Sequence, residues 1–159
     1  MKILLIPALL LNLSFAAMLD DYLGSLKQEV IKENPNFQGF DAKRGEEIFT
    51  SKHIGKKGKE ISCTTCHTSN LSNSGENTFT GKTIEPLSPK ANPKRFTDIK
   101  EIEKWMKRNF NDVYNREGTA LEKGDVTTYI INQERKKHEI LNFFNNSFKL
   151  FICRVILIR

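Results

Sequence analysis

Three residues, Cys63, Cys66 and His67, have the types and the spacing to hold a cofactor. Two cysteines three positions apart face the same side of a helical turn, so their sulfurs can form thioether bonds to the two vinyl groups of one porphyrin. The histidine that follows directly can offer its imidazole to the central iron as the proximal ligand. Because Cys-x-x-Cys-His is the signature of c-type haem attachment, the sequence predicts one covalently bound haem c.

Two other interpretations of the same cysteines are weaker. A structural zinc site would need a second ligand pair, such as another Cys-x-x-Cys or a His-x3-His. The one remaining cysteine in the sequence is Cys153, and the other histidines, His53 and His138, are isolated. A thioredoxin-like dithiol would need a strand–helix–strand context, which the flanking sequence does not provide. The haem interpretation is therefore preferred.

Four helices are predicted around this motif, and they must position it. They have apolar residues at three- and four-residue steps, with recognisable start or stop signals. They cover residues 18–33, 42–53, 96–113 and 118–133. The expected caps are Asp41 for the second helix, Thr97 or Asp98 for the third, and a capping box of Thr119 and Glu122 for the fourth.

The segments between the predicted helices read as loops. A basic, glycine-containing loop precedes the haem motif, and residues 69–93 are rich in Ser, Asn, Thr, Gly and Pro. A long loop in a small domain needs an explanation, and wrapping a flat cofactor is one. The expected fold class is all-α: a small helical domain wrapped round one covalent haem, with long loops and no substantial sheet.

The first residues have the layout of a secretory signal peptide: one lysine, an apolar run from Ile3 to Phe15, then small residues. We expect removal of residues 1–16, or of 1–17 if the cut follows Ala17, and a periplasmic location in a bacterium. The alternative is an uncleaved anchor helix. This division leaves residues 17–133 as one haem domain and 134–159 as a C-terminal extension of uncertain structure.

The charge and the C-terminal tail say little about partners. The formal net charge is +6, and acids alternate with bases along most of the chain, so we expect no nucleic-acid binding. The last residues, from Phe148, are mostly apolar but too few to span a bilayer. They could contact a membrane surface as a basic amphipathic segment, but a floppy appendage or a non-native extension is preferred. Cys153 is then a stray thiol.

Longer motifs carry a resemblance to a known family. Gly45 and Phe49 before the haem motif, with Tyr129 in the last helix, resemble a class I cytochrome c, in which the first and last helices cross at a small residue and an aromatic one. The segments SCTTCH, TGKTIEPLSPKANPKRFTD, EKWMKRNFN and EKGDVTTYIINQ, in this order and spacing, resemble the SHP-type cytochromes c. The similarity runs over residues 41–133. It implies a monohaem protein whose iron is held by a histidine and by an asparagine that follows an arginine, here Asn109 after Arg108.

The residues themselves leave the sixth iron ligand open. On a helical wheel Asn109 lies inside the apolar arc of its helix, where an unpartnered amide costs about 1–3 kcal/mol. A carbonyl, a water or a frayed helix end could also satisfy it. Met106 is the main competitor, because a thioether is common in electron-transfer cytochromes c, although methionine also fills cores. His53 and His138 are weaker candidates.

An asparagine ligand would bind through its oxygen, a hard and weak donor that suits ferric better than ferrous iron. We therefore expect one-electron transfer together with redox-gated binding of O2, NO or CO, since the asparagine would leave on reduction. The alternative is an ordinary low-spin His/Met electron carrier. An enzyme would want a distal acid–base group, and none can be assigned, although weak peroxidase-like or reductase activity stays open.

Other expectations follow from the resemblance. It implies that Trp105 packs on the haem, and that a dihaem cytochrome c or a membrane cytochrome b is a plausible redox partner. Founding members bridge two cysteines at positions that hold Phe110 and Gly118 here, so we expect a less restrained loop. A lysine cluster before the haem motif could steer an acidic partner, or could simply be solvated. It consists of Lys52, Lys56, Lys57 and Lys59.

Overall fold

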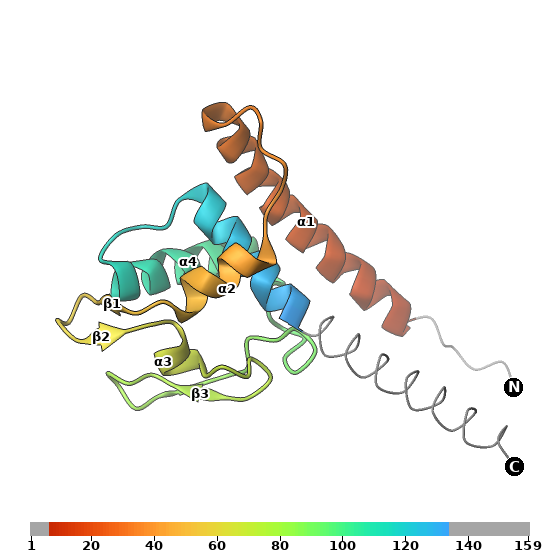
Figure 1. Ribbon diagram of the computed structural model, residues 1–159. Coiled ribbons are helices and arrows are strands. Elements are labelled where there is room, and N and C mark those ends of the chain that lie inside the picture. The colour runs from red at the N-terminus through yellow and green to blue at the C-terminus, as the bar shows by residue number, and fades with distance from the viewer. Residues whose placement is uncertain (1–6, 134–159) are drawn as a thin grey trace, which may run out of the picture.

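The structure, a computed structural model, describes residues 7–133, with side chains described from residue 18 onward. Figure 1 shows a helical domain in which α2 and the last described helix cross, while α1 runs along one side. The helices are α1 (Pro7–Glu33), α2 (Ala42–Thr50), α3 (Thr64–His67), α4 (Ile99–Tyr114) and a final helix over residues 120–133. The predicted extension 134–159, with His138 and Cys153, lies outside the described residues.

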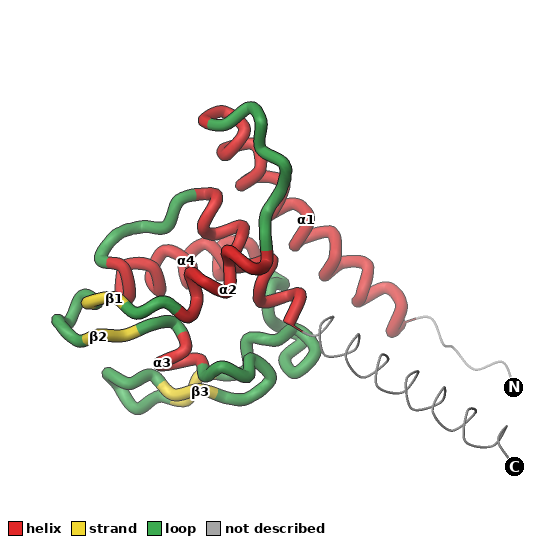
Figure 2. Tube along the Cα trace, in the orientation of Figure 1, coloured by secondary structure: helices red, strands yellow, loops and turns green. Residues whose placement is uncertain are grey.

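Strands are few and very short. β1 (His53–Ile54) pairs antiparallel with β2 (Glu60–Ile61), and β3 (Gly75–Glu76) pairs antiparallel with β4 (Thr83–Ile84). Figure 2 shows how much of the remaining chain is loop. The predicted all-α class without a substantial sheet is confirmed for the described part of the chain.

Helix α1 is longer than the predicted 18–33 helix but ends where predicted, just before Asn34-Pro35. Its buried face belongs to the same core as α2 and α4, and consists of Leu19, Tyr22, Leu26 and Val30. The expected cleavage points after residues 16 and 17 fall inside this helix, and removal of residues 1–16 stays a prediction. No helix within residues 7–133 combines the length and apolarity needed to cross a bilayer.

The crossing of α2 with the 120–133 helix depends on a glycine, Gly45, which has no side chain. A Cβ added at Gly45 would overlap the backbone carbonyl of Asp125 and would lie 2.8 Å from Tyr129 Cβ. Phe49, one turn further along α2, packs on Tyr129 with ring centroids 5.4 Å apart. The predicted pairing of Gly45 with Tyr129 is therefore confirmed.

An ion pair between a buried carboxylate and a half-exposed arginine stabilises the same crossing. Asp125 is almost fully buried and accepts hydrogen bonds from Arg44 Nε at 2.8 Å, from Arg44 Nη2 at 2.9 Å and from the Asp41 backbone at 2.7 Å. Asp41 in turn caps α2 by accepting from the Arg44 backbone N–H at 2.8 Å, as predicted. Since removing one partner of such a pair leaves a buried charge uncompensated, these three residues hold the N-terminus of α2 in place.

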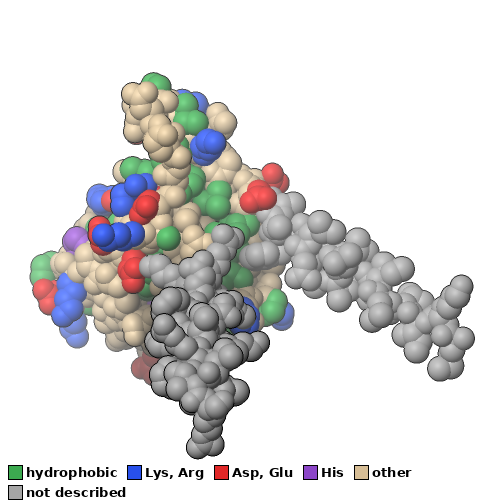
Figure 3. Space-filling view, turned by 45° about the vertical axis from the view of Figure 1, so that its right-hand side comes forward, with side chains coloured by type: hydrophobic (Ala, Val, Ile, Leu, Met, Phe, Trp, Pro, Cys, Tyr) green, Lys and Arg blue, Asp and Glu red, His purple; other side chains and the backbone are tan. Residues whose placement is uncertain are grey.

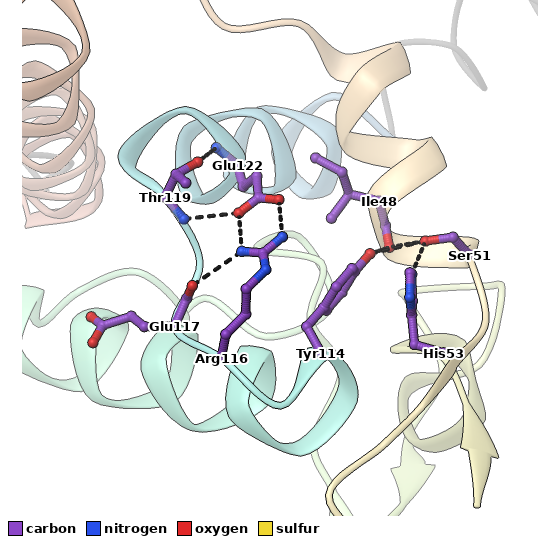
Figure 4. A network of polar contacts seen from close by, with 8 residues as sticks. All are labelled: Ile48, Ser51, His53, Tyr114, Arg116, Glu117, Thr119 and Glu122. Atoms are coloured by element: carbon purple, nitrogen blue, oxygen red, sulfur yellow. Dashed lines mark hydrogen bonds and ion pairs between the residues drawn. The ribbon is translucent and has the colours of Figure 1, made fainter. Parts of the chain in front are cut away.

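Helix α2 ends at Thr50, three residues earlier than predicted, because the chain turns into the β1–β2 hairpin. His53 Nε2 hydrogen-bonds Ser51 Oγ at 3.0 Å, and its ring packs on Tyr114 at 4.1 Å between centroids. Ser51 Oγ also bonds the Tyr114 hydroxyl, which donates to the Ile48 carbonyl at 2.6 Å (Figure 4). The network joins the C-terminal ends of α2 and α4, and His53 is a partly buried member of it.

The other two caps agree with the sequence. Asp98, of the two candidates, caps α4 by accepting from the backbone N–H groups of Lys100 and Glu101. Thr119 and Glu122 form a reciprocal capping box, with N···O distances of 2.8 and 3.2 Å, and Figure 4 shows both bonds. With these ends fixed, α4 presents one buried stripe to the core: Ile102, Met106, Phe110 and Val113.

Candidate functional site

The two cysteines and the histidine lie on one helical turn that includes α3, as predicted. Cys63 immediately precedes α3, and its carbonyl accepts from the His67 backbone N–H at 3.0 Å, which closes a helical turn. Ser62 and Thr65 support that turn through a 2.9 Å bond from the Ser62 N–H to Thr65 Oγ1. Cys63 and Cys66 are free thiols, so both sulfurs are available for thioether formation.

Two cavities, of about 420 and 280 Å3, meet at this helix. The larger lies within the size range of cofactor pockets, about 300–1,000 Å3. Six residues line both: Cys63, His67, Leu87, Arg95, Trp105 and Asn109. Cys66 lines the larger and Met106 the smaller. The structure therefore brings the predicted haem-binding residues to a shared wall, while His53 lines neither cavity.

Burial sets the chemistry of Cys63 and His67. Desolvation, with a smaller effect from Cys66, raises the pKa of the Cys63 thiol to about 12. A redox-active dithiol needs a lowered thiol pKa, so this environment argues against thioredoxin-like chemistry. Desolvation, and then the charge of Arg95, lowers the pKa of His67 to about 4. Its imidazole is therefore neutral at physiological pH, the form that coordinates a metal.

Asn109 projects from α4 into both cavities and is only partly exposed. Within residues 18–133 no hydrogen bond reaches its amide, whereas the neighbouring Asn111 amide donates to the Lys107 carbonyl at 3.0 Å. Met106 is 8% exposed and belongs to the hydrophobic core. Of the two predicted sixth ligands, Asn109 is the one whose polar group lacks a partner in the described part of the chain.

Trp105 lies at the rim of both cavities and is 42% exposed. Its indole N–H donates to Glu101 at 3.1 Å, and the cationic groups of Lys104 and Arg108 lie 5.2 and 5.5 Å from its ring. Its large apolar face is therefore held where a flat cofactor in the cavities would contact it. Packing of Trp105 on the haem stays a prediction.

The chain matches known proteins over this same region. A family model described as a domain of unknown function, DUF1924, matches residues 35–130. The cytochrome c-type protein SHP of Cereibacter sphaeroides is 45% identical over 93 residues, which are 58% of this chain and 71% of that protein. The chain belongs to this family, the SHP-type cytochromes c. Membership implies haem c as the cofactor, and it agrees with the expectation of a carrier or ligand-binding protein rather than an enzyme.

Solved structures of SHP-type and related cytochromes share the fold. Oxidized SHP, an oxygen-binding cytochrome c, superposes with a TM-score of 0.64 at 36% identity, covering 72% of this chain and 96% of that one. The solution structure of cytochrome c'' from Methylophilus methylotrophus, presented as an insight into the structural basis of haem-ligand detachment, gives a TM-score of 0.64 at 31% identity, covering 72% and 93%. These likenesses confirm the predicted cytochrome fold.

The site residues of this SHP-type chain fit a haem on structural grounds. The His67 ring has no hydrogen bond from residues 18–133 and contacts Phe49, with ring centroids 6.1 Å apart. The Asn109 amide is likewise without a hydrogen-bond partner there, and the two thiols are unbridged. Two thiols and one imidazole, the groups that a covalent haem requires, thus line the larger cavity together with the Asn109 amide.

Two positions where the resemblance implies a disulfide are in direct contact here. A Cβ added at Gly118 would lie 2.7 Å from Phe110 Cδ2, so the ring packs on the glycine backbone. The following capping box and the pair between Arg116 and Glu122, at 2.6 Å, hold the same loop (Figure 4). Packing and ion pairs therefore restrain the loop after Asn109. That it is less restrained than a disulfide-bridged loop stays a prediction.

This contact yields a prediction. Gly118→Ala should destabilise the protein by about 1–3 kcal/mol, because its methyl group would force the Phe110 ring aside in a packed core. Urea unfolding measures the effect, and Gly24→Ala is the matched control, since a Cβ at Gly24 meets no atom within 4 Å. Adding Phe110→Leu to Gly118→Ala should restore part of the loss. Equal stability of Gly118→Ala and the wild type would contradict this packing.

Sequence reasoning missed Arg95, which lines both cavities. It lies in a loop without periodicity, so no helix or strand pattern could assign it to the site. Its one signal was its position inside the TGKTIEPLSPKANPKRFTD segment that resembles the family.

Proposed function

We propose that this protein is an exported monohaem cytochrome c that carries one electron and binds small diatomic gases under redox control. Cys63 and Cys66 would hold the haem through thioether bonds, His67 would be the proximal ligand, and Asn109 would be a distal ligand that leaves on reduction. The signal peptide over residues 1–16 would deliver the chain to the periplasm. When bound, the haem supplies the one-electron couple and the gas-binding iron.

One observation carries the proposal: His67 and Asn109 line the same two cavities as Cys63, and neither has a hydrogen-bond partner within residues 18–133. Burying polar groups without partners is costly, so a metal between them would account for both. The amide oxygen of asparagine is a hard and weak donor, which favours ferric iron. Its release on reduction would open a site for O2, NO or CO.

The relatives support the same function. SHP is called an oxygen-binding cytochrome c, and the solution structure of cytochrome c'' concerns haem-ligand detachment. Oxygen binding and haem-ligand detachment are thus properties named for two proteins that share this fold. Each is at least 31% identical to the chain.

An ordinary His/Met electron carrier is the second candidate, because Met106 lines the smaller cavity. Met106→Leu tests it, since leucine conserves volume in the core. We expect the ferric protein to stay low-spin and the ferrous protein to bind CO as the wild type does. Loss of the low-spin ferric spectrum in Met106→Leu would instead assign the sixth ligand to the thioether.

A basic hairpin beside the site would serve electron transfer. Lys52, Lys56, Lys57 and Lys59 lie on or beside β1 and β2, and Lys57 Nζ lies 4.3 Å from the centroid of the Phe79 ring, which lines the larger cavity. Acids are interspersed with bases on the face seen in Figure 3. Electron exchange with an acidic partner, such as a dihaem cytochrome c or a membrane cytochrome b, should slow as ionic strength rises. A rate of electron exchange that does not change with salt would show that the lysines of the hairpin do not contribute to partner docking.

A further inference from the structure

Arg95 is held at the wall of the haem cavities by backbone carbonyls. Its Nε donates to the Pro86 carbonyl at 2.9 Å, and its Nη2 donates to the Glu85 carbonyl at 2.7 Å. These bonds fix the plane of the guanidinium group, which lines both cavities together with Cys63 and His67. The two bonds therefore hold the side chain at the site.

Backbone hydrogen bonds and a left-handed residue fix the turn that carries Arg95. Its N–H donates to the Asn92 carbonyl at 3.0 Å, and the Asn92 N–H donates to the carbonyl of Ser88, which is fully buried. The next residue, Phe96, is buried and has a φ of 59°, a left-handed conformation that costs a bulky residue of order 1–3 kcal/mol. Such strain persists where the surrounding structure imposes it, which here is the turn that delivers Arg95.

Arg95 forms no ion pair in the described part of the chain. A guanidinium has five N–H donors, and only two of them are used by the two carbonyls. No carboxylate of residues 18–133 forms an ion pair with it, whereas Arg44 pairs with Asp125 and Arg116 pairs with Glu122. Burial lowers the pKa of Arg95, with Glu85 acting in the opposite direction. A partly buried cation that faces a cavity without a partner calls for an anion there.

We propose that Arg95 binds a propionate carboxylate of the haem and fixes the orientation of the cofactor in the cavities. The inference rests on the proposed covalent haem, whose two propionates are the carboxylates that would enter with it. Arginine suits this role because its planar fork matches a carboxylate with two parallel hydrogen bonds. The thioether bonds of Cys63 and Cys66 would then hold the vinyl edge, and Arg95 the propionate edge.

Other cations near the cavities are less suited to this role. Lys82, Lys94 and Arg108 each line one cavity, but all three are exposed, so water already solvates their charges. An exposed ion pair contributes about 0–1 kcal/mol. The Arg95 guanidinium is partly buried, so a carboxylate beside it would offset more of the cost of removing its charge from water.

The test compares holoprotein variants by reduction potential. Pairing with Arg95 would offset the negative charge of a propionate, so Arg95→Gln should lower the midpoint potential by stabilising ferric haem. Arg95→Lys, which keeps the charge without the fork, should fall between Arg95→Gln and the wild type. Lys100→Gln is the matched control for net charge, since Lys100 is exposed and lines neither cavity, and it should leave the potential close to the wild-type value.

A second measurement needs no variant. A crystal structure of the wild-type holoprotein should place a propionate oxygen within hydrogen-bond distance of the Arg95 guanidinium. Both propionates in solvent or on other side chains, or equal potentials for Arg95→Gln and Lys100→Gln, would overturn the inference while leaving the haem assignment intact. A wild-type protein without covalent haem would instead refute the proposed function itself.

Discussion

Replacing both Cys63 and Cys66 with alanine is expected to abolish covalent haem attachment, leaving a colourless chain after maturation in a competent periplasm. The two sulfurs flank a single helical turn, and no other cysteine lies within residues 7–133 to replace them. The measurement is haem staining of the denatured protein together with the pyridine haemochrome spectrum. The apoprotein should also unfold at lower temperature, because a cofactor that binds only the native state stabilises it.

Cys153→Ala is the control for this variant. Its cysteine lies outside the haem motif, so the substitution should leave haem content unchanged. Each single variant, Cys63→Ala or Cys66→Ala, should retain at most one thioether and yield less holoprotein. Full covalent haem in the double variant would contradict the assignment of these sulfurs.

Replacing Asn109 with alanine is expected to make the ferric haem accessible without reduction. If Asn109 occupies the distal position in about nine of ten ferric molecules, it weakens the apparent binding of an added ligand about tenfold. Its removal should therefore tighten ferric cyanide binding by about tenfold or more and should convert the low-spin ferric spectrum to a high-spin one. Optical titration with cyanide and the ferric spectrum measure both effects.

Asn111→Ala is the matched control, because it removes the same side chain two residues along α4 at a position that lines neither cavity. It should lose the 3.0 Å bond to the Lys107 carbonyl and little else. A ferric Asn109→Ala protein with the spectrum and cyanide affinity of the wild type would show that another group occupies the distal position.

Much of the scaffold could be predicted because it depends on local chemistry. The caps at Asp41, Asp98 and Thr119 were predictable from the sequence. A short polar side chain just before an apolar repeat accepts hydrogen bonds from the first free N–H groups of a helix. The Cys-x-x-Cys-His turn is equally local. The role of Gly45 was predictable because the motif around it resembles the helix crossing of class I cytochromes c. A side chain at this position would overlap the Asp125 carbonyl.

The remaining features depend on contacts between distant segments. The end of α2 was placed too late, because the β1–β2 pairing that draws His53 out of the helix has no sequence signature over two residues. Arg95 could not be assigned, because its carbonyl partners lie nine and ten residues earlier in an irregular loop. The resemblance implies that positions 110 and 118 lie together, but it does not predict how they pack, since a glycine gives no sign of the ring that lies on it.

The most direct test of the account is the visible spectrum of the dithionite-reduced wild-type protein, recorded before and after addition of CO. If Asn109 leaves on reduction, the ferrous protein is high-spin and five-coordinate, and CO converts it fully to a low-spin complex. A ferrous protein that remains low-spin and does not react with CO would contradict redox-gated ligand binding.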